Sequence, residues 1–146
     1  MKKYLNFIHS RDFPLYLAWT TALIGTVGSY YFSNGLGYQP CVLCWYQRIA
    51  MYPLVIIIAV GISKKDKTMP LYALPLSIVG LVIALYQNLL YFGIVPEKVS
   101  ACTFGISCTT KYIHWFGFVS IPLLALLAFV VITFSLLASW RINKNV

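Results

Sequence analysis

Four long apolar segments constrain what this chain can fold into more than any other feature of its sequence. They cover residues 14–33, 42–62, 71–93 and 116–140. The only charged side chain within them is Arg48. A helix needs about 20 residues to cross the hydrocarbon core of a bilayer, which is roughly 30 Å thick. We therefore predict an all-α fold, an integral membrane four-helix bundle with up-down-up-down topology, in which residues 1–146 form a single membrane domain.

The composition agrees with a membrane protein and excludes the main soluble classes. Of the 146 residues, 60% are hydrophobic and 10% are charged, which is too apolar for a water-soluble domain of this length. The formal net charge of +8 is typical of many nucleic-acid-binding proteins, but such binding requires Lys and Arg clustered on a soluble scaffold. Here the basic residues lie between the apolar segments, so we expect no nucleic acid partner.

The distribution of basic residues predicts the orientation of the bundle in the membrane. Cytoplasmic loops retain Lys and Arg, whereas loops on the opposite side are depleted of them. Eight basic residues lie in the two tails and in the loop after the second segment; they are Lys2, Lys3, Arg11, Lys64, Lys65, Lys67, Arg141 and Lys144. The two remaining loops, residues 34–41 and 94–115, together contain only Lys98 and Lys111. We therefore expect a multi-pass protein of the cell membrane, with both termini in the cytoplasm and these two loops on the extracytoplasmic face.

All four cysteines lie in or beside the two predicted extracytoplasmic loops. Cys41 and Cys44 close the first loop, and Cys102 and Cys108 lie within the second. Disulfides form and persist on an oxidising outer face, so we interpret the four residues as two potential disulfides. Four cysteines allow three pairings, and the short separations favour Cys41 with Cys44 and Cys102 with Cys108.

Three roles are open to these cysteine pairs. In the first, the chain is a small membrane scaffold with structural loop disulfides, although a C-x-x-C bridge closes too few residues to remove much unfolded-state entropy. In the second, the cysteines bind zinc, but their spacing matches zinc ligands loosely and an oxidising face opposes free thiolates. Redox exchange is the role that we favour, because a short C-x-x-C disulfide is easily exchanged.

The residues around the C-V-L-C motif at 41–44 suit a reactive thiolate. Pro40 is suited to the first turn of the second helix, where its missing N–H leaves no donor unpaired, and this places the cysteines in the first turn or two. The positive end of a helix lowers the pKa of a thiol, and Arg48, four residues after Cys44, lies on the same helical face. The alternative for Arg48 is a side chain that snorkels to the membrane interface beside Trp45.

The stretch from Gln39 to Arg48 resembles the membrane thiol oxidases of the DsbB type, including the shorter BdbC-type members of Gram-positive bacteria. The resemblance rests on Gln39-Pro40 before the C-V-L-C motif, on Trp45-Tyr46-Gln47-Arg48 after it, and on a second cysteine pair ahead of the fourth segment. It extends over essentially the whole chain, with four spans and both ends inside.

Members of this family reoxidise a secreted thioredoxin-like (DsbA-like) thiol oxidase and pass its electrons to a membrane quinone, so the resemblance implies a thiol:quinone oxidoreductase. Carried over by position, it implies that the partner's thiolate attacks Cys102, that Cys108 exchanges with Cys41, and that Cys44 becomes the thiolate beside the quinone. Arg48 stabilises that thiolate and the quinone oxygen in this scheme. The similarity to the short members favours menaquinone over ubiquinone.

The second loop departs from the larger Gram-negative members of the family. It comprises only residues 94–115, and Cys102 and Cys108 are five residues apart, which leaves Cys108 less chain with which to reach Cys41. The vitamin K epoxide reductase type also combines four spans, two cysteine pairs and a quinone. In that type the loop pair precedes the C-x-x-C motif, which is the reverse of the order seen here.

Gln87 and Asn88 are the two residues of the third segment that we assign to the quinone site. They lie roughly 8 Å below the outer end of that segment at 1.5 Å per residue, a depth at which a quinone headgroup can accept hydrogen bonds. Interhelical hydrogen bonding is the alternative for both side chains, and it is the commoner role of such residues in membrane helices.

Overall fold

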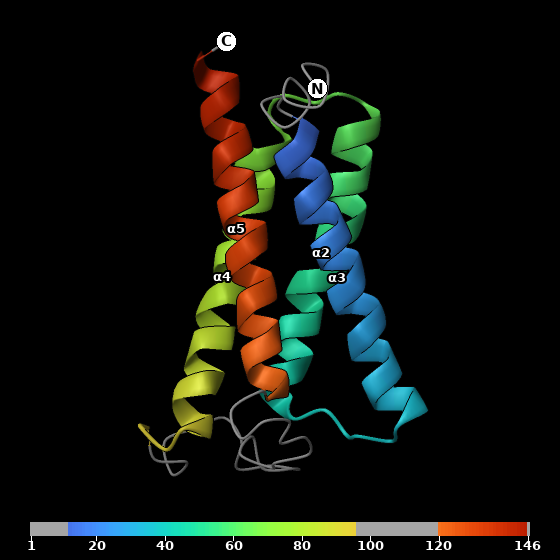
Figure 1. Ribbon diagram of the computed structural model, residues 1–146, viewed down its shortest axis with the longest axis vertical. Helices are drawn as coiled ribbons and strands as arrows, with labels where there is room; N and C mark the ends of the chain where they lie inside the picture. The colour runs from blue at the N-terminus through green and yellow to red at the C-terminus, as the bar shows by residue number, and fades with distance from the viewer. Residues whose placement is uncertain (1–11, 96–119, 146) are drawn as a thin grey trace, which may run out of the picture.

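A computed structural model of the chain describes residues 12–95 and 120–145, and long α-helices occupy most of both ranges (Figure 1). The four helices are α2 (Asp12–Tyr30), α3 (Val42–Ser63), α4 (Met69–Tyr91) and α5 (Ile121–Asn145). A π-helical turn, η1, continues α2 over Tyr31–Gly35. No β-strand occurs within the described ranges, and the predicted all-α class with four helices is confirmed.

The helices begin and end close to the apolar segments but not at their limits. Helix α4 begins two residues before the predicted segment because Pro70 lies in its first turn, where proline is tolerated. Helix α5 extends beyond the apolar segment to Asn145, because the polar residues that follow Trp140 continue the helix. The first four residues of the predicted segment 116–140 lie outside the described residues.

Three of the described helices are long and apolar enough to cross a membrane: α3, α4 and the Ile121–Lys144 part of α5. Helix α2, with 19 residues, is not among them, and it carries four serine and threonine side chains, namely Thr20, Thr21, Thr26 and Ser29. The hydroxyls of Thr20 and Thr21 donate to main-chain carbonyls one turn earlier in the same helix. Such bonds satisfy a hydroxyl without a solvent partner.

The helices form an antiparallel ring, in which each packs against the next in sequence and α5 packs against α2 (Figure 1). Apolar side chains fill the centre of the ring, among them Leu15, Ala18, Leu54, Ile58, Phe129, Ile132 and Leu136. Large apolar side chains also cover the outside, where Ile24, Ile56 and Phe134 are 66–72% exposed. An apolar outer surface is what lipid contact requires.

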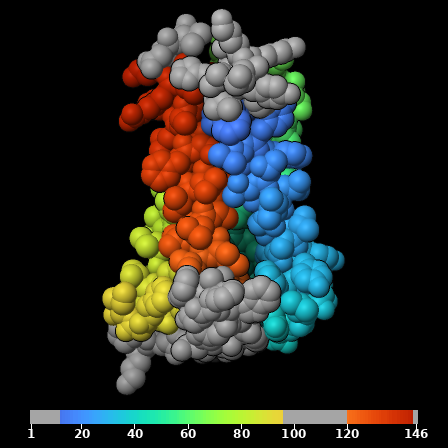
Figure 2. All heavy atoms as spheres, viewed as in Figure 1, coloured from blue at the N-terminus to red at the C-terminus, as the bar shows by residue number. Residues whose placement is uncertain are grey.

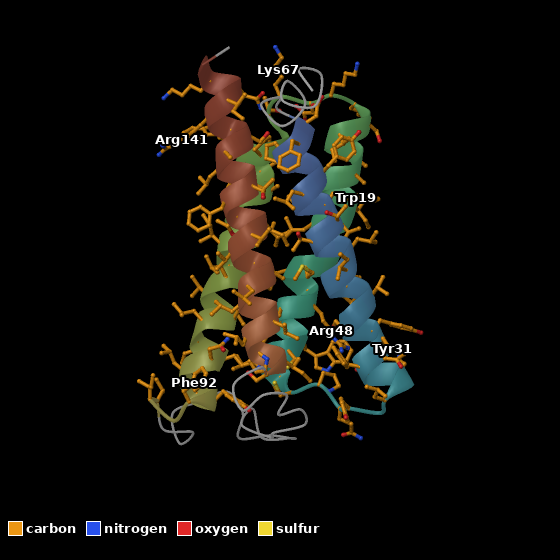
Figure 3. The ribbon with its side chains drawn as sticks, viewed as in Figure 1. Trp19, Tyr31, Arg48, Lys67, Phe92 and Arg141 are labelled. Atoms are coloured by element: carbon orange, nitrogen blue, oxygen red, sulfur yellow. The ribbon has the colours of Figure 1, made fainter. Side chains whose placement is uncertain are left out.

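The two ends of the bundle differ in charge (Figure 3). Lys67 and Arg141 lie at the end where α3 connects to α4, whereas Arg48 lies toward the opposite end, near Tyr31 and Phe92. The Cys41–Cys44 motif belongs to this second end, at the start of α3. The site described below is therefore separated from the lysine-rich end by most of the length of the bundle.

The close approach of α4 and α5 depends on Gly80. A Cβ atom at this position would overlap the ring of Phe129, whose side chain is fully buried. Small residues in membrane helices allow neighbouring helices to approach and to gain dispersion contacts. The ring of Phe129 occupies the space that the missing side chain leaves.

We expect Gly80→Ala to lower the free energy of unfolding by about 1–3 kcal/mol, because the added methyl group displaces the Phe129 ring. The measurement is thermal or denaturant unfolding of the purified protein in detergent. Gly28→Ala is the matched control, since no heavy atom lies within 4 Å of a Cβ at that position. An equal loss of stability in both variants would contradict the role of Gly80.

Candidate active site

The Cys41–Cys44 pair lies at the N-terminus of α3. The helix begins at Val42, and Cys41 is its N-cap residue, with φ −70° and ψ 170°. The carbonyl of Cys41 accepts the first helical hydrogen bond, from the Trp45 N–H at 3.1 Å. Cys44 is the third residue of the helix, and its Sγ lies 2.9 Å from Cys41 Sγ, as a hydrogen-bonded pair of free thiols. Cys44 is in the first turn, as predicted, but Cys41 caps the helix, and Pro40 precedes it instead of lying in its first turn.

The two thiols differ in their surroundings. Cys41 is buried, whereas Cys44 is partly exposed. The hydrogen bond with Cys44, together with burial, raises the pKa of the Cys41 thiol above its ordinary value. Cys44 lies where the unpaired N–H groups and the positive dipole of a helix N-terminus stabilise an anion. This asymmetry favours Cys44 as the site of the negative charge of the reduced pair, with Cys41 Sγ 2.9 Å away.

A side-chain amide from α4 contacts both sulfur atoms. Gln87 Nε2 lies 3.2 Å from Cys44 Sγ and 3.4 Å from Cys41 Sγ. Gln87 Oε1 in turn accepts a hydrogen bond of 2.6 Å from Gln47 Nε2 of α3. Both glutamines are buried, with 2% of Gln87 and 7% of Gln47 exposed. These bonds connect the cysteine pair to α4 and back to the second turn of α3.

The guanidinium of Arg48 is held against α2 and η1 (Figure 3). Arg48 Nε donates to Ser29 Oγ at 2.7 Å, and Nη2 donates to Ser29 O at 2.8 Å and to Ser33 Oγ at 2.9 Å. The guanidinium carbon lies 5.4 Å from the centre of the Trp45 ring, within cation–π range. Arg48 is thus anchored inside the bundle by α2 and η1.

A cavity of about 420 Å³ opens beside these residues. All four helices contribute to its wall, with Gly25, Gly28 and Ser29 from α2, Cys44, Gln47 and Arg48 from α3, Gln87 from α4, and Ala125 and Ala128 from α5. Figure 2 shows a recess between α2 and α5 on the outer surface of the bundle. The wall is mainly apolar, and its polar groups gather around the N-terminus of α3.

This cavity fits the quinone that the family resemblance implies. Its volume lies within the range of roughly 300–1,000 Å³ that is usual for small-molecule sites, and an apolar wall with a few polar groups is typical of such sites. Cys44, Arg48 and Gln87 provide those groups on one side of the cavity. Ser120, which directly precedes α5, also lines it, and its buried hydroxyl has no hydrogen-bond partner among the residues that the structure describes. A flat ring with carbonyl oxygens can therefore accept hydrogen bonds here.

The two residues assigned to the quinone site from α4 point in different directions. Gln87 lines the cavity, but Asn88 does not. Asn88 Nδ2 donates to the carbonyls of Ala84 and Pro122, at 2.8 Å each, and so connects α4 to the start of α5. Neighbouring residues of a helix are about 100° apart around its axis, which directs Asn88 to the α4–α5 interface. The contacts of Asn88 are therefore those of an interhelical hydrogen bond, the alternative considered for this residue.

The predicted site residues and the residues found in the structure overlap only in part. Cys102 and Cys108 lie outside the described residues. Ser29, Ser33 and Gln47 belong to the site but were not predicted from the sequence. Ser29 and Ser33 are four residues apart, which is the spacing of two side chains on one helical face, and Gln47 follows Cys44 by three residues. These spacings were the available indications.

Comparisons with known proteins agree on one family. The family model described as "Disulfide bond formation protein DsbB" matches residues 11–139. The chain is 42% identical over 135 residues to probable disulfide formation protein C 1 of Bacillus anthracis, which covers 92% of this chain and 95% of that relative. It is 44% identical over 118 residues to disulfide bond formation protein C of Bacillus subtilis (strain 168), with 81% and 86% covered. No solved structure matches at a significant level.

We expect Cys44 to be alkylated before Cys41 when the reduced protein is treated with a limiting amount of iodoacetamide. Cys44 is the more exposed residue and lies at the positive end of the helix dipole, whereas Cys41 is buried and its pKa is raised. The measurement is peptide mapping by mass spectrometry in a full-length Cys102→Ser, Cys108→Ser variant. Denatured protein, in which both thiols react, is the control, and preferential labelling of Cys41 in the folded protein would refute the assignment.

Proposed function

Because the chain belongs to the DsbB family of disulfide bond formation proteins, which are membrane disulfide oxidoreductases, we propose that it passes electrons from an extracytoplasmic thioredoxin-like thiol oxidase to a membrane quinone. The observation that carries this proposal is the cavity beside Cys44, with the Arg48 guanidinium in its wall. A structural disulfide in a scaffold protein needs neither a ligand-sized cavity nor a cation next to its sulfurs. The cavity therefore favours an electron acceptor over the scaffold role.

The proposed reaction begins at the second cysteine pair. A thiolate of the partner attacks Cys102 of the Cys102–Cys108 disulfide, which forms a mixed disulfide and releases Cys108 as a thiolate. Cys108 then attacks Cys41 of the Cys41–Cys44 disulfide, and Cys44 is released as a thiolate. The partner's second thiolate displaces Cys102 from the mixed disulfide, so the partner leaves oxidised. Cys102 in turn displaces Cys41 from Cys108, which restores the loop disulfide and leaves Cys41 and Cys44 holding two electrons.

The second half of the reaction uses the residues around the cavity. A bound quinone supplies an acceptor for two electrons and two protons and is released as the quinol. Cys44 Sγ lines the cavity and provides the electron pair. The Arg48 guanidinium, in the cavity wall, stabilises the negative charge that develops on the acceptor oxygen, as preorganised donors do in an apolar site. Cys41 Sγ, 2.9 Å from Cys44 Sγ, then closes the disulfide again.

We also propose the location and the quinone. The end of the bundle that carries the C-x-x-C motif faces the extracytoplasmic side, and the opposite end, with Lys64, Lys65, Lys67, Arg141 and Lys144, faces the cytoplasm. This orientation places the cysteines in an oxidising compartment, where a secreted DsbA-like partner can reach them. The similarity to short relatives from Bacillus supports menaquinone over ubiquinone as the quinone.

The experiment that tests this function is quinone reduction by the purified protein with a reduced thioredoxin-like partner. We expect turnover of a soluble menaquinone analogue by the wild type and none by Cys44→Ala, which lacks the sulfur that faces the cavity. The assay follows quinone absorbance, with partner oxidation measured in parallel. Ser77→Ala, which alters a buried hydroxyl away from the site, is the control. Absence of turnover in a folded, oxidised wild type with a competent partner would refute the proposal.

We expect Arg48→Ala to slow quinone reduction by about 10²-fold, which is the usual effect of removing a donor that stabilises developing negative charge. Disulfide exchange with the partner should remain largely intact, since the loop pair that meets the partner does not require the Arg48 charge. Single-turnover oxidation of the partner without quinone measures exchange, and steady-state turnover measures quinone use. Arg141→Ala, at the opposite end of the bundle, is the matched control. An equal loss of both steps in Arg48→Ala would contradict this role.

A further inference from the structure

The proposed reaction leaves the buried pair of glutamines beside the sulfurs without a role. Gln47 and Gln87 come from different helices and meet in the interior, where only 7% and 2% of their surfaces are exposed. Placing two primary amides in an apolar bundle is costly unless their hydrogen bonds are satisfied. Their bonds form one chain, which runs from Gln47 Nε2 to Gln87 Oε1 and from Gln87 Nε2 to the two sulfurs.

The donor-to-acceptor direction of these hydrogen bonds determines which end of the Gln87 amide faces the sulfurs. An amide has a donor end and an acceptor end, and the bond from Gln47 occupies the acceptor end of Gln87. The donor end of Gln87 is thereby turned toward Cys44 and Cys41. If the Gln87 amide turned over, its oxygen would face the sulfurs and its nitrogen would face the donor of Gln47. The bond from Gln47 therefore holds Gln87 with its donor end toward the sulfurs.

A donor at this position does not stabilise both redox states of the pair equally. A disulfide sulfur is a weak acceptor, whereas a thiolate accepts charge-assisted hydrogen bonds that are roughly twice as strong as neutral ones. Gln87 is closer to Cys44 than to Cys41, at 3.2 Å against 3.4 Å, and Cys44 is the sulfur at the cavity. The amide therefore favours the reduced pair with its charge on Cys44.

We infer that Gln87 is a catalytic residue that stabilises the Cys44 thiolate and raises the reduction potential of the Cys41–Cys44 pair, and that Gln47 is the positioning residue that keeps the Gln87 amide turned toward the sulfurs. This inference deepens the proposed function and rests on it for the identity of Cys44 as the electron donor. A higher potential favours the uptake of electrons from the loop pair and holds them at the cavity as a thiolate.

Two other roles of Gln87 predict different behaviour. A hydrogen bond to the quinone requires an amide proton directed at the ligand, but the amide nitrogen of Gln87 donates to the two sulfurs. Packing between α3 and α4 would contribute to stability without changing the potential of the cysteine pair. The reduction potential is therefore the quantity that separates the three roles.

The test uses the full chain with Cys102→Ser and Cys108→Ser, so that one redox pair remains. The protein is equilibrated with glutathione buffers at one mildly alkaline pH, and its thiols are trapped with a maleimide that shifts the protein on a gel. We expect Gln87→Met to lower the ratio of dithiol to disulfide about tenfold at fixed glutathione, which corresponds to a potential lower by about 30 mV. Gln47→Met should lower it about threefold, because Gln87 keeps its amide but loses its fixed orientation.

The double variant distinguishes positioning from a direct effect. If Gln47 acts only through Gln87, adding Gln47→Met to Gln87→Met should change the potential no further. Ser77→Ala, which removes the acceptor of an interhelical hydrogen bond from Thr133, is the control and should leave the potential unchanged. Gln87→Asn, which keeps an amide but shortens it by one methylene, is the second variant if Gln87→Met does not fold, and it should also lower the potential.

An unchanged reduction potential in folded Gln87 variants would overturn the inference. This holds even if the variants differ from the wild type in stability or in KM for quinone. Additive effects of the two glutamine variants would overturn the positioning role of Gln47. Neither outcome depends on the partner or the quinone, because the potential is measured without them. Failure of the wild type to reduce quinone would instead refute the proposed function. The reduction potentials of the Gln47 and Gln87 variants would still show whether these residues act on the cysteine pair.

Discussion

The absence of hydrogen-bond partners in a lipid environment is the constraint on which the rest of this structure depends. Backbone groups must be satisfied within each segment, which permits helices and explains why they occupy most of the described residues. The polar side chains of the site likewise find partners inside the bundle. Arg48 finds Ser29 and Ser33, and Gln87 finds Gln47 and the two sulfurs. The need to satisfy buried polar groups thus gathers the reactive residues at one end of the bundle.

The features that were predicted from the sequence are those that depend on local patterns. Segment length and apolarity indicated four helices, because the thickness of a bilayer translates directly into a number of residues. Pro40 indicated a helix start beside the cysteine pair, because proline is tolerated there, and Cys41 is indeed the N-cap residue of α3 with Cys44 in its first turn. The residues from Gln39 to Arg48, together with the second cysteine pair, indicated the family, which the comparisons confirm.

The features that were not predicted depend on how the helices rotate and pack. Gln87 and Asn88 are adjacent and equally polar, yet one contacts the sulfurs and the other connects α4 to α5. Nothing in the local sequence separates them, because the rotation of α4 about its axis is decided by packing contacts such as Gly80 against Phe129. The partnership of Gln47 with Gln87 joins positions 40 residues apart, which no spacing rule within one helix can reveal.

The cavity is the place where the bundle departs from close packing, and small residues of α2 leave this space open. A helix bundle that maximised its contacts would fill a space of about 420 Å³, because every lining atom loses dispersion contacts to a void. Helix α2 instead presents Gly25 and Gly28 to the cavity, and no heavy atom lies within 4 Å of a Cβ placed at Gly28. Elsewhere, at Gly80, the same residue type brings two helices together. Glycine therefore has opposite consequences at the two positions: it tightens the packing of α4 on α5, and beside Cys44 it leaves room for a ligand.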